Sequence, residues 1–194
     1  MLQRDGGVCV TRRESYAAIM TPFTIRTATP DDAPALAALG RATFIETFVT
    51  GFGIPYPPKD LERFLDKTFS EATTRTRLTD PDHQYWVAVR DDEILGFANT
   101  GRCGLPHPDA RPGHAELHRL YVSKAAQGLG VGTALLKVAL DWMEANSDGP
   151  LWIGVWSGNE KAQKLYAAYG FEKAGEYQYP VGDWLDDEFI LRRG

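Results

Sequence analysis

The stretch that most constrains the fold is residues 114–146, where a strand pattern runs through three closely spaced glycines into a helix pattern. Residues 117–122 are rich in strand-forming side chains. Further along, apolar side chains recur at spacings of three and four, which is typical of one helix face. They are Val131, Leu135, Val138 and Trp142. The stretch therefore predicts a strand–turn–helix unit.

The turn between this strand and this helix has the properties of an anion site. The first N–H groups of a helix have no partner within the helix, and the helix dipole adds partial positive charge there. Glycine also lets the backbone adopt positive φ and approach a phosphate closely. Glycines stand at positions 128, 130 and 132, which is more than an ordinary tight turn needs. We therefore expect a pyrophosphate cradle.

The spacing of the glycines separates this loop from two other phosphate motifs. The dinucleotide-binding fingerprint needs a glycine where Thr133 stands, and no Walker A run starts at Gly128. The remaining pattern is Gln127-x-x-Gly130-x-Gly132 directly after a Leu-Tyr-Val strand. This arrangement resembles the acetyl-CoA site of the GNAT acetyltransferase superfamily.

The resemblance implies an α/β fold with a mixed, mostly antiparallel central sheet flanked by helices. It implies acetyl-CoA as cosubstrate, with the pantetheine amides held by free backbone groups of the central strand around Leu120 and Val122. The pyrophosphate would bind the N–H groups of the loop. The loop residues concerned are Gln127, Gly128, Gly130, Gly132 and Thr133.

A second segment carries the same resemblance, since Asn159-x-x-Ala162-x-x-x-Tyr166-x-x-x-Gly170-Phe171 is similar to the family's pattern after its fifth strand. By that resemblance Asn159 contacts the cofactor arm, and Tyr166 is the general acid for the thiolate leaving group. A phenol with a pKa of about 10 stays protonated at neutral pH, which suits that role. The alternative for Tyr166 is a core aromatic residue, the role expected of its neighbour Tyr169.

The amine must lose a proton to attack the thioester, and two candidate bases stand on the central strand. Glu116 and His118 share a face of a regular strand, because side chains repeat every second residue. In the resembling family a glutamate near this position often acts through ordered water, so Glu116 is expected to be catalytic. The scattered histidines and the two cysteines, Cys9 and Cys103, give no convincing metal ligands.

The composition of the chain restricts the classes of binding partner that are expected. With 21 basic and 26 acidic residues the net charge is −5, and no basic run favours nucleic acid. No apolar run is long enough to span a bilayer, and the two cysteines fit a reducing compartment. We expect a cytoplasmic enzyme with a small-molecule amine substrate and no nucleic-acid or membrane partner. A homodimer is compatible with the sequence, which does not fix the oligomeric state.

The acceptor amine is less constrained by the sequence. The segments 42–48, 151–160 and 179–183 resemble bacterial spermidine/spermine N-acetyltransferases. A polyamine site needs spaced carboxylates and aromatic walls. The candidate carboxylates are Glu46, Glu62, Glu116, Asp183, Asp186 and Asp187. The alternatives are a protein N-terminus, an amino acid, an amino-sugar or an antibiotic amine, and a regulator that binds CoA without turnover.

The remaining periodicity predicts the order of the elements. Residues 1–21 lack any pattern and are expected to be a disordered extension before a single domain, residues 22–194. Further strands are expected at 23–28, 85–90, 93–100, 151–156, 172–179 and 185–192. Helices are expected from Thr29 through Phe48 and at 60–69, 70–78 and 159–169.

Overall fold

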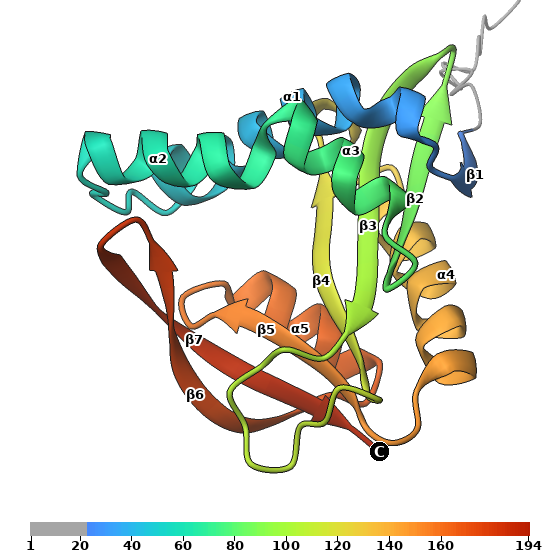
Figure 1. Cartoon of the computed structure of the whole chain (residues 1–194), viewed down its shortest axis with the longest axis vertical. Helices are drawn as coiled ribbons and strands as arrows, with labels where there is room; N and C mark the ends of the chain where they lie inside the picture. Colours follow the sequence, from blue (N-terminus) through green and yellow to red (C-terminus); the bar gives the residue numbers. More distant parts are fainter. Residues whose placement is uncertain (1–22) are drawn as a thin grey trace, which may run out of the picture.

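The structure is a computed structural model that describes residues 23–194, so the expectations for residues 1–21 lie outside the described residues. Its centre is one seven-stranded sheet with helices on both faces (Figure 1). The strands are β1 (Thr24–Thr27), β2 (His83–Arg90), β3 (Glu93–Arg102), β4 (Ala115–Val122), β5 (Leu151–Trp156), β6 (Glu172–Val181) and β7 (Trp184–Arg193).

The helices lie close to the predicted ranges. The α-helices are α1 (Ala33–Phe44), α2 (Pro58–Phe69), α3 (Glu71–Thr79), α4 (Val131–Asn146) and α5 (Glu160–Ala168). Two short 3-10 turns, η1 (Pro30–Asp32) and η3 (Lys124–Ala126), precede α1 and α4. The predicted N-cap Thr29 is present, because Thr29 and Asp32 form a reciprocal capping box.

The strand order is β1-β2-β3-β4-β5-β7-β6, and every neighbouring pair except β4 and β5 is antiparallel. This confirms the predicted mixed, mostly antiparallel sheet. Within the described chain, β4 and β5 pair only at Glu116 and Leu117. Beyond that point the two strands diverge, as Figure 1 shows. The sheet therefore opens at its centre.

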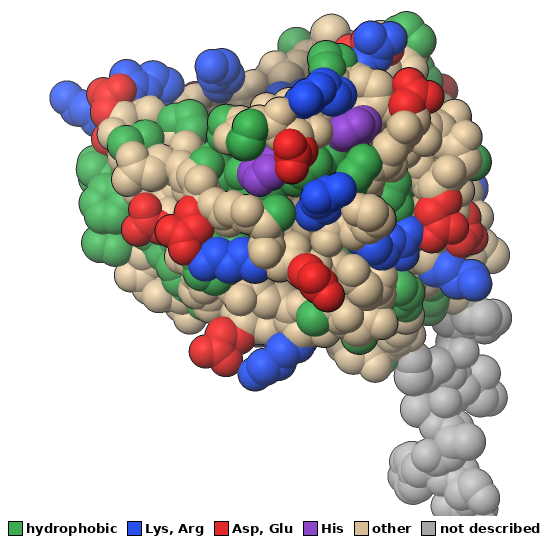
Figure 2. Space-filling model, turned by 90° about the horizontal axis from the view of Figure 1, so that it is seen from below, with side chains coloured by type: hydrophobic (Ala, Val, Ile, Leu, Met, Phe, Trp, Pro, Cys, Tyr) green, Lys and Arg blue, Asp and Glu red, His purple; other side chains and the backbone are tan. Residues whose placement is uncertain are grey.

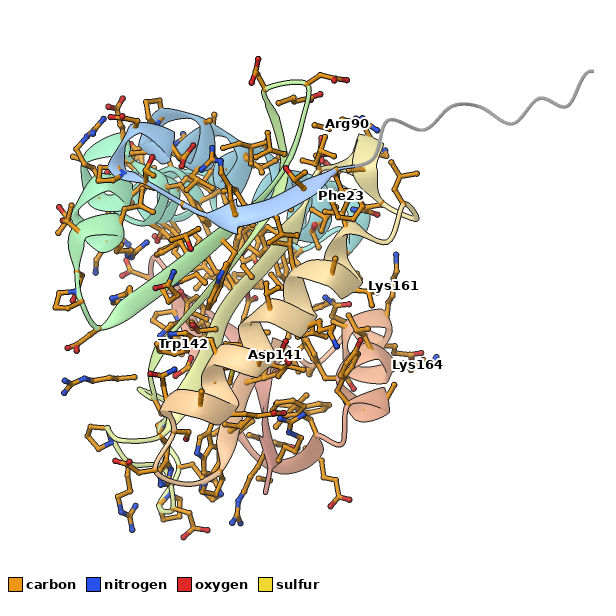
Figure 3. All side chains as sticks on the ribbon, turned by 90° about the vertical axis from the view of Figure 1, so that its right-hand side faces the viewer. Phe23, Arg90, Asp141, Trp142, Lys161 and Lys164 are labelled. Carbon is orange, nitrogen blue, oxygen red and sulfur yellow. The ribbon has the colours of Figure 1, made fainter. Side chains whose placement is uncertain are left out.

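The two faces of the sheet have separate cores. On the α4 face, covered by α4 and α5, Leu135 and Met143 are fully buried. Figure 3 shows α4 crossing this face with α5 beside it, and Lys161 and Lys164 pointing away from the sheet. On the α2 face, covered by α1, α2 and α3, an aromatic core centres on Phe44. The open centre of the sheet thus lies between two packed layers.

The first helix differs from the prediction. The sequence pattern predicts one α-helix through Phe48, but α1 ends at Phe44 and continues as the π-helix η2 (Ile45–Gly51). The wider turn is visible in the backbone, where Phe52 donates its N–H to Thr47, five residues back. Phe48 remains on the apolar side, with its ring centroid 4.7 Å from that of Phe44. Such π-turns occur frequently at functional sites.

Two predicted turns are confirmed by their backbone angles. Asp91 and Asp92 both have positive φ, as a two-residue turn in the β2–β3 hairpin requires. Gly170 has a φ of 83° just after α5, which is the left-handed conformation expected at a helix end. Across residues 23–194, no helix combines the length and the apolar character needed to cross a membrane.

Candidate active site

The open edge of β4 is the backbone feature on which the site is built. Ser123 donates its N–H to Leu95 of β3. Because successive residues of a strand point their backbone groups to opposite sides, those of Leu120 and Val122 point away from β3 toward the gap beside β5. Both residues were predicted to bind the cofactor. Their amide groups are available to a ligand that inserts between the diverging strands.

The loop after β4 has the conformation expected of an anion cradle. Gly128 and Gly130 have φ values of 80° and 83°, and a Cβ at either position would have no atom within 4 Å. Gly130 is the N-cap of α4, so the N–H groups of Val131, Gly132 and Thr133 begin the helix without partners inside it. Open space therefore faces a set of convergent donors.

The end of β4 and the loop that follows it carry polar groups that match the polarity of the predicted ligand. Gln127 is exposed and its side-chain amide lies 3.5 Å from the carbonyl oxygen of Val122. The Ser123 hydroxyl is buried and has no hydrogen-bond partner among the described residues. A free strand edge, an unpaired hydroxyl and a glycine cradle follow one another along the chain. This arrangement fits a long molecule with amides at one end and a pyrophosphate at the other.

Tyr166 lies on α5 and is buried in the core of the α4 face. Its ring packs edge-to-face against Phe171, with 6.4 Å between centroids. Burial raises the pKa of Tyr166, so the phenol is neutral at physiological pH and can donate its proton. The hydroxyl has no hydrogen-bond partner among the described residues, and it is close enough to affect the pKa of Tyr121 on β4. A free, protonated donor therefore stands near the gap.

The other two residues of this motif have structural roles that the sequence does not reveal. Asn159 is the N-cap of α5, and its Oδ1 accepts the backbone N–H of Ala162 at 3.1 Å. The amide NH₂ of Asn159 has no hydrogen-bond partner among the described residues and can donate to a ligand. Tyr169 is half-buried, and its carbonyl oxygen accepts a hydrogen bond from Arg193. Tyr169 is thus a packing residue at the end of α5, as predicted.

Glu116 is buried at the point where β4 and β5 separate. Its Oε1 lies 3.2 Å from Nδ1 of His118, and its Oε2 accepts the N–H of Gly104 at 2.8 Å. Burial alone would raise the pKa of Glu116, but its hydrogen bonds and the neighbouring His118 outweigh burial and lower it. Both predicted bases are therefore brought together, and both oxygens of Glu116 are engaged.

The buried and half-buried carboxylates of the α2 face form a row that begins at Glu116. Paired residues of neighbouring strands share a face, and Glu116 pairs with Trp152 while Glu188 pairs with Trp156. Since Trp152 and Trp156 are four residues apart on β5, both carboxylates lie on the same face. Of the six carboxylates named from the sequence, Glu116 and Asp186 are buried here. The other four, Glu46, Glu62, Asp183 and Asp187, are exposed.

Glu188 was not among the predicted site residues. Its Oε2 accepts a hydrogen bond from the Tyr177 hydroxyl at 2.5 Å, and Asp186 accepts one from the Tyr56 hydroxyl at 2.5 Å. Burial raises the pKa of Glu188 to about 7, and the Tyr177 hydrogen bond only partly offsets this effect. The alternation Asp186-x-Glu188 on the last predicted strand was the available signal, because it places both residues on one face.

An absent side chain makes room for this carboxylate. A Cβ at Gly154 of β5 would stand 2.6 Å from the Tyr177 hydroxyl and 3.1 Å from Oε2 of Glu188. Any larger residue would displace the hydrogen-bonded pair. Gly154 therefore allows the carboxylate to lie against the backbone of β5, on the same face as Glu116.

Aromatic rings stand beside the carboxylates. Phe52 lies over Trp156, with 4.6 Å between ring centroids, and Phe48 meets the same indole edge-on at 6.3 Å. Phe52 keeps 39% of its surface exposed. Aromatic faces attract cations, and carboxylates pair with them. The wall formed by η2 and β5 is therefore suited to a cationic group.

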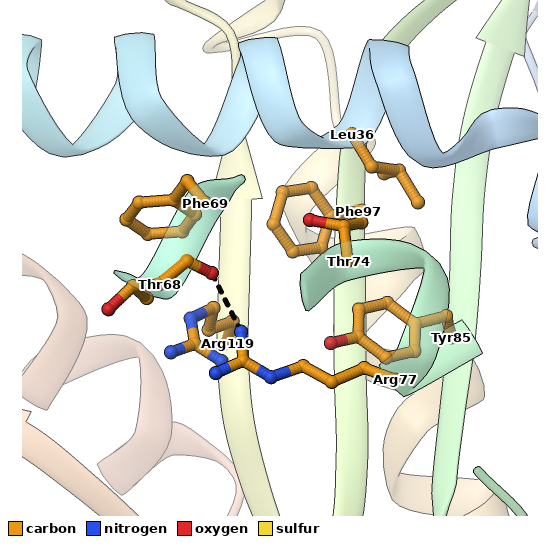
Figure 4. Close-up of a pocket in the computed structure, with 8 residues that line it drawn as sticks. All are labelled: Leu36, Thr68, Phe69, Thr74, Arg77, Tyr85, Phe97 and Arg119. Atoms are coloured by element: carbon orange, nitrogen blue, oxygen red, sulfur yellow. Dashed lines mark hydrogen bonds between the residues drawn. The ribbon is translucent and has the colours of Figure 1, made fainter. Parts of the chain in front are cut away.

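Two arginines, Arg77 and Arg119, are among the residues that line a small cavity of about 10 Å³ on the α2 face (Figure 4). Arg77 donates to the carbonyl oxygen of Thr68 at 2.8 Å, and Arg119 lies over the Phe69 ring at 5.5 Å. Neither arginine forms a salt bridge with another described residue. Burial and the charge of Arg119 lower the pKa of Arg77. No motif in the sequence indicates this pair.

The distribution of charged side chains on one face of the molecule does not indicate a separate binding site. Seen from below Figure 1, acidic and basic side chains alternate and neither sign forms a continuous patch on that face (Figure 2). In the described part of the chain, no group of three or more His, Cys, Asp or Glu side chains could hold a metal ion. Burial, followed by Glu116, raises the pKa of Cys103 to about 11, so this buried thiol is protonated at neutral pH.

Comparison with known proteins shows which family the sequence matches. Residues 42–171 match the profile of the acetyltransferase (GNAT) family. An uncharacterised N-acetyltransferase of Lactobacillus delbrueckii subsp. lactis is 29% identical over 174 residues, which cover 90% of this chain and 98% of that protein. The N-alpha-acetyltransferase RimI of Mycobacterium tuberculosis is 28% identical over 154 residues, covering 79% of this chain and 81% of that protein.

A solved structure shares the fold. The PaiA N-acetyltransferase of Thermoplasma acidophilum, solved in complex with coenzyme A, superimposes with a TM-score of 0.69. It is 19% identical in sequence, and the match covers 89% of this chain and 98% of that one. At this level of identity the likeness concerns the fold.

Proposed function

Because the chain belongs to the acetyltransferase (GNAT) family and takes its acetyl group from acetyl-CoA, we propose that it transfers that group directly to a primary amine held on the α2 face. The observation that carries this proposal is the row of buried and half-buried carboxylates on that face, next to the opening between β4 and β5. A cationic amine needs such partners when it leaves water.

The cofactor contacts in this proposal follow the chain from the open strand into the helix. The backbone groups of Leu120 and Val122 that point into the gap hold the pantetheine amides, and the amide NH₂ of Asn159 contacts the same arm. The pyrophosphate takes the donors of the glycine loop. The loop residues assigned to it are Gln127, Gly128, Gly130, Gly132 and Thr133. Acetyl-CoA supplies the activated thioester.

The chemistry assigned to the chain needs one acid and one base. Tyr166 protonates the departing sulfur, which its neutral, unpaired hydroxyl supports. Two carboxylates, the buried Glu116 and the half-buried Glu188, are placed to take the amine proton. Transfer is direct, because a buried thiol with a raised pKa, as at Cys103, is a poor nucleophile. The free thiol is also consistent with a reducing compartment, and we place the enzyme in the cytoplasm.

A polyamine is the first candidate acceptor. Three carboxylates of one face, Glu116, Asp186 and Glu188, are accompanied by the rings of Phe52 and Trp156. Spermidine and spermine carry several ammonium groups, and such a wall offers each a carboxylate or an aromatic face.

A peptide N-terminus or an amino acid is the second candidate, and the arginine pair favours it. Burial raises the pKa of Tyr179, and the charges of Arg119 and Arg77 act on this pKa against those of Glu188 and Glu116, so both signs of charge lie near one ring. An acceptor with an amine and an anionic group would satisfy both sides. The N-alpha-acetyltransferase RimI is a relative whose name describes this kind of acceptor.

A panel of acceptors tests the proposal. CoA thiol release is followed with acetyl-CoA and spermidine, spermine, free amino acids, a peptide with a free N-terminus and an aminoglycoside. We expect spermidine and spermine to give the highest kcat/KM, and added salt to raise their KM because it screens the carboxylates. A preference for the peptide or amino acids would support the second candidate. No amine-dependent release with any acceptor would contradict the proposed function.

A further inference from the structure

We propose that Glu188 on β7, rather than Glu116 on β4, is the general base that takes the proton from the acceptor amine. The inference rests on the proposed function and specifies the chemistry of the same site. It follows from the different partners of two carboxylates that share one face of the sheet.

Glu116 is committed to the surrounding structure. One of its oxygens faces Nδ1 of His118, and the other accepts the N–H of Gly104 at the start of the loop between β3 and β4. A proton on Oε2 of Glu116 would break its contact with Gly104 in a buried place, where unpaired polar groups are costly, and a proton on Oε1 would require Nδ1 of His118 to be an acceptor. These contacts instead indicate a positioning role, which ties the 103–113 loop to the strand.

Glu188 has one oxygen engaged and one free. Oε2 accepts the Tyr177 hydroxyl, whereas Oε1 has no hydrogen-bond partner among residues 23–194. The residue is half-buried, so the free oxygen can meet a substrate. It lies on the strand next to β5, on the α2 face and beside the rings of Trp156 and Phe52. A bound ammonium group would find this oxygen as its acceptor.

Burial and the groups around Glu188 favour proton uptake near neutral pH, and burial is the main cause. Carboxylates act on it from β4 (Glu116) and from β7 itself (Asp186). Phenols lie near it on β4 (Tyr121), on β6 (Tyr177 and Tyr179) and in the segment before α2 (Tyr56). The carboxylates repel its negative charge and the Tyr177 hydrogen bond stabilises it. A base with a pKa near the working pH is the most effective kind.

The protons balance in this scheme. The ammonium group gives one proton to Oε1 of Glu188, and the neutral nitrogen bonds to the acetyl carbonyl carbon as the carbon–sulfur bond breaks. The sulfur takes the hydroxyl proton of Tyr166. The second nitrogen proton returns to the Tyr166 phenolate through solvent, and Glu188 releases its proton to solvent. Each turnover therefore releases one proton.

The test compares pH profiles of kcat with the acceptor that gives the highest turnover in the panel. In the wild type, kcat should rise with increasing pH through an apparent pKa near 7, which gives the profile an acidic limb. Glu188→Gln should lower kcat by about 10²–10⁴-fold and remove this acidic limb. Tyr177→Phe deletes a donor that stabilises the carboxylate, so the limb should move to higher pH. Glu116→Gln removes a repelling charge, so the limb should move to lower pH.

Acetyl-CoA affinity and circular dichroism confirm that each variant is folded. A limb retained by Glu188→Gln and lost by Glu116→Gln would overturn the proposal and assign the base to Glu116. A substrate-free measurement separates this outcome from failure of the proposed function. In enzyme labelled with ¹³C-carboxyl glutamate, the signal missing from Glu188→Gln should titrate near pH 7. Titration near pH 4, the ordinary value for glutamate, would equally overturn the proposal.

Discussion

Tyr166→Phe should lower turnover by about 10²–10⁴-fold, the usual contribution of a general acid. The substitution keeps the ring that packs against Phe171 and deletes only the hydroxyl. Since that hydroxyl has no partner among the described residues, its removal leaves no buried group unsatisfied there. Melting temperature and acetyl-CoA affinity should therefore stay close to the wild-type values. Steady-state thiol release and calorimetry measure the two effects separately.

The matched control is Tyr169→Phe, three residues along the same segment. The Tyr169 ring is half-buried, and its carbonyl bond to Arg193 does not involve the side chain. Loss of its hydroxyl should change turnover little. If both substitutions had the same small effect, the sulfur would be protonated by another group or by water, and the role given to Tyr166 would be wrong.

Gly130→Glu should weaken acetyl-CoA binding by about 100-fold or more, which corresponds to roughly 2.7 kcal/mol. Position 130 is the N-cap of α4, and a side chain there would project into open space rather than into the protein. The folded variant would then present a carboxylate to the pyrophosphate, at the donors that the cradle offers. Isothermal calorimetry with acetyl-CoA measures the loss.

Gly130→Glu also introduces backbone strain, because a non-glycine residue at positive φ costs about 1–2 kcal/mol, and this strain contributes to the measured loss of affinity. Gly53→Glu is the matched control for this strain. Gly53 also has a positive φ, 68°, and a Cβ at this position would likewise have no atom within 4 Å, but the residue lies after η2. Its variant should lose similar stability and keep its acetyl-CoA affinity. Unchanged affinity in a folded Gly130→Glu variant would contradict the cradle assignment.

Much of the fold follows from local patterns in the sequence. Glycine at 170 and the two aspartates at 91–92 stand where the backbone adopts positive φ. Apolar side chains at helical spacing predict α4, because its packing against the sheet depends on that spacing. The π-helix after Phe44 was missed, since the same apolar spacing is compatible with an α-helix and the extra residue per turn depends on tertiary contacts.

The cofactor side of the candidate site could be predicted better than the acceptor side. The residues assigned to the cofactor lie mainly along one continuous segment, so short-range sequence spacing describes them. Glu188, Arg77 and Arg119 belong to β7, α3 and β4, and their neighbours are distant in the chain. No local pattern reveals that Gly154 makes space for the Tyr177–Glu188 pair. Such contacts arise only when the strands are assembled in the order β4-β5-β7-β6.

Direct transfer from acetyl-CoA to an amine requires both substrates on the enzyme at once, which a two-substrate initial-rate measurement detects. Thiol release is recorded while acetyl-CoA and the best acceptor of the panel are both varied. Both substrates must be bound together when the nitrogen attacks, so double-reciprocal plots should intersect. Parallel lines, with acetyl retained on the protein after acetyl-CoA alone, would show a covalent acetyl-enzyme and exclude direct transfer.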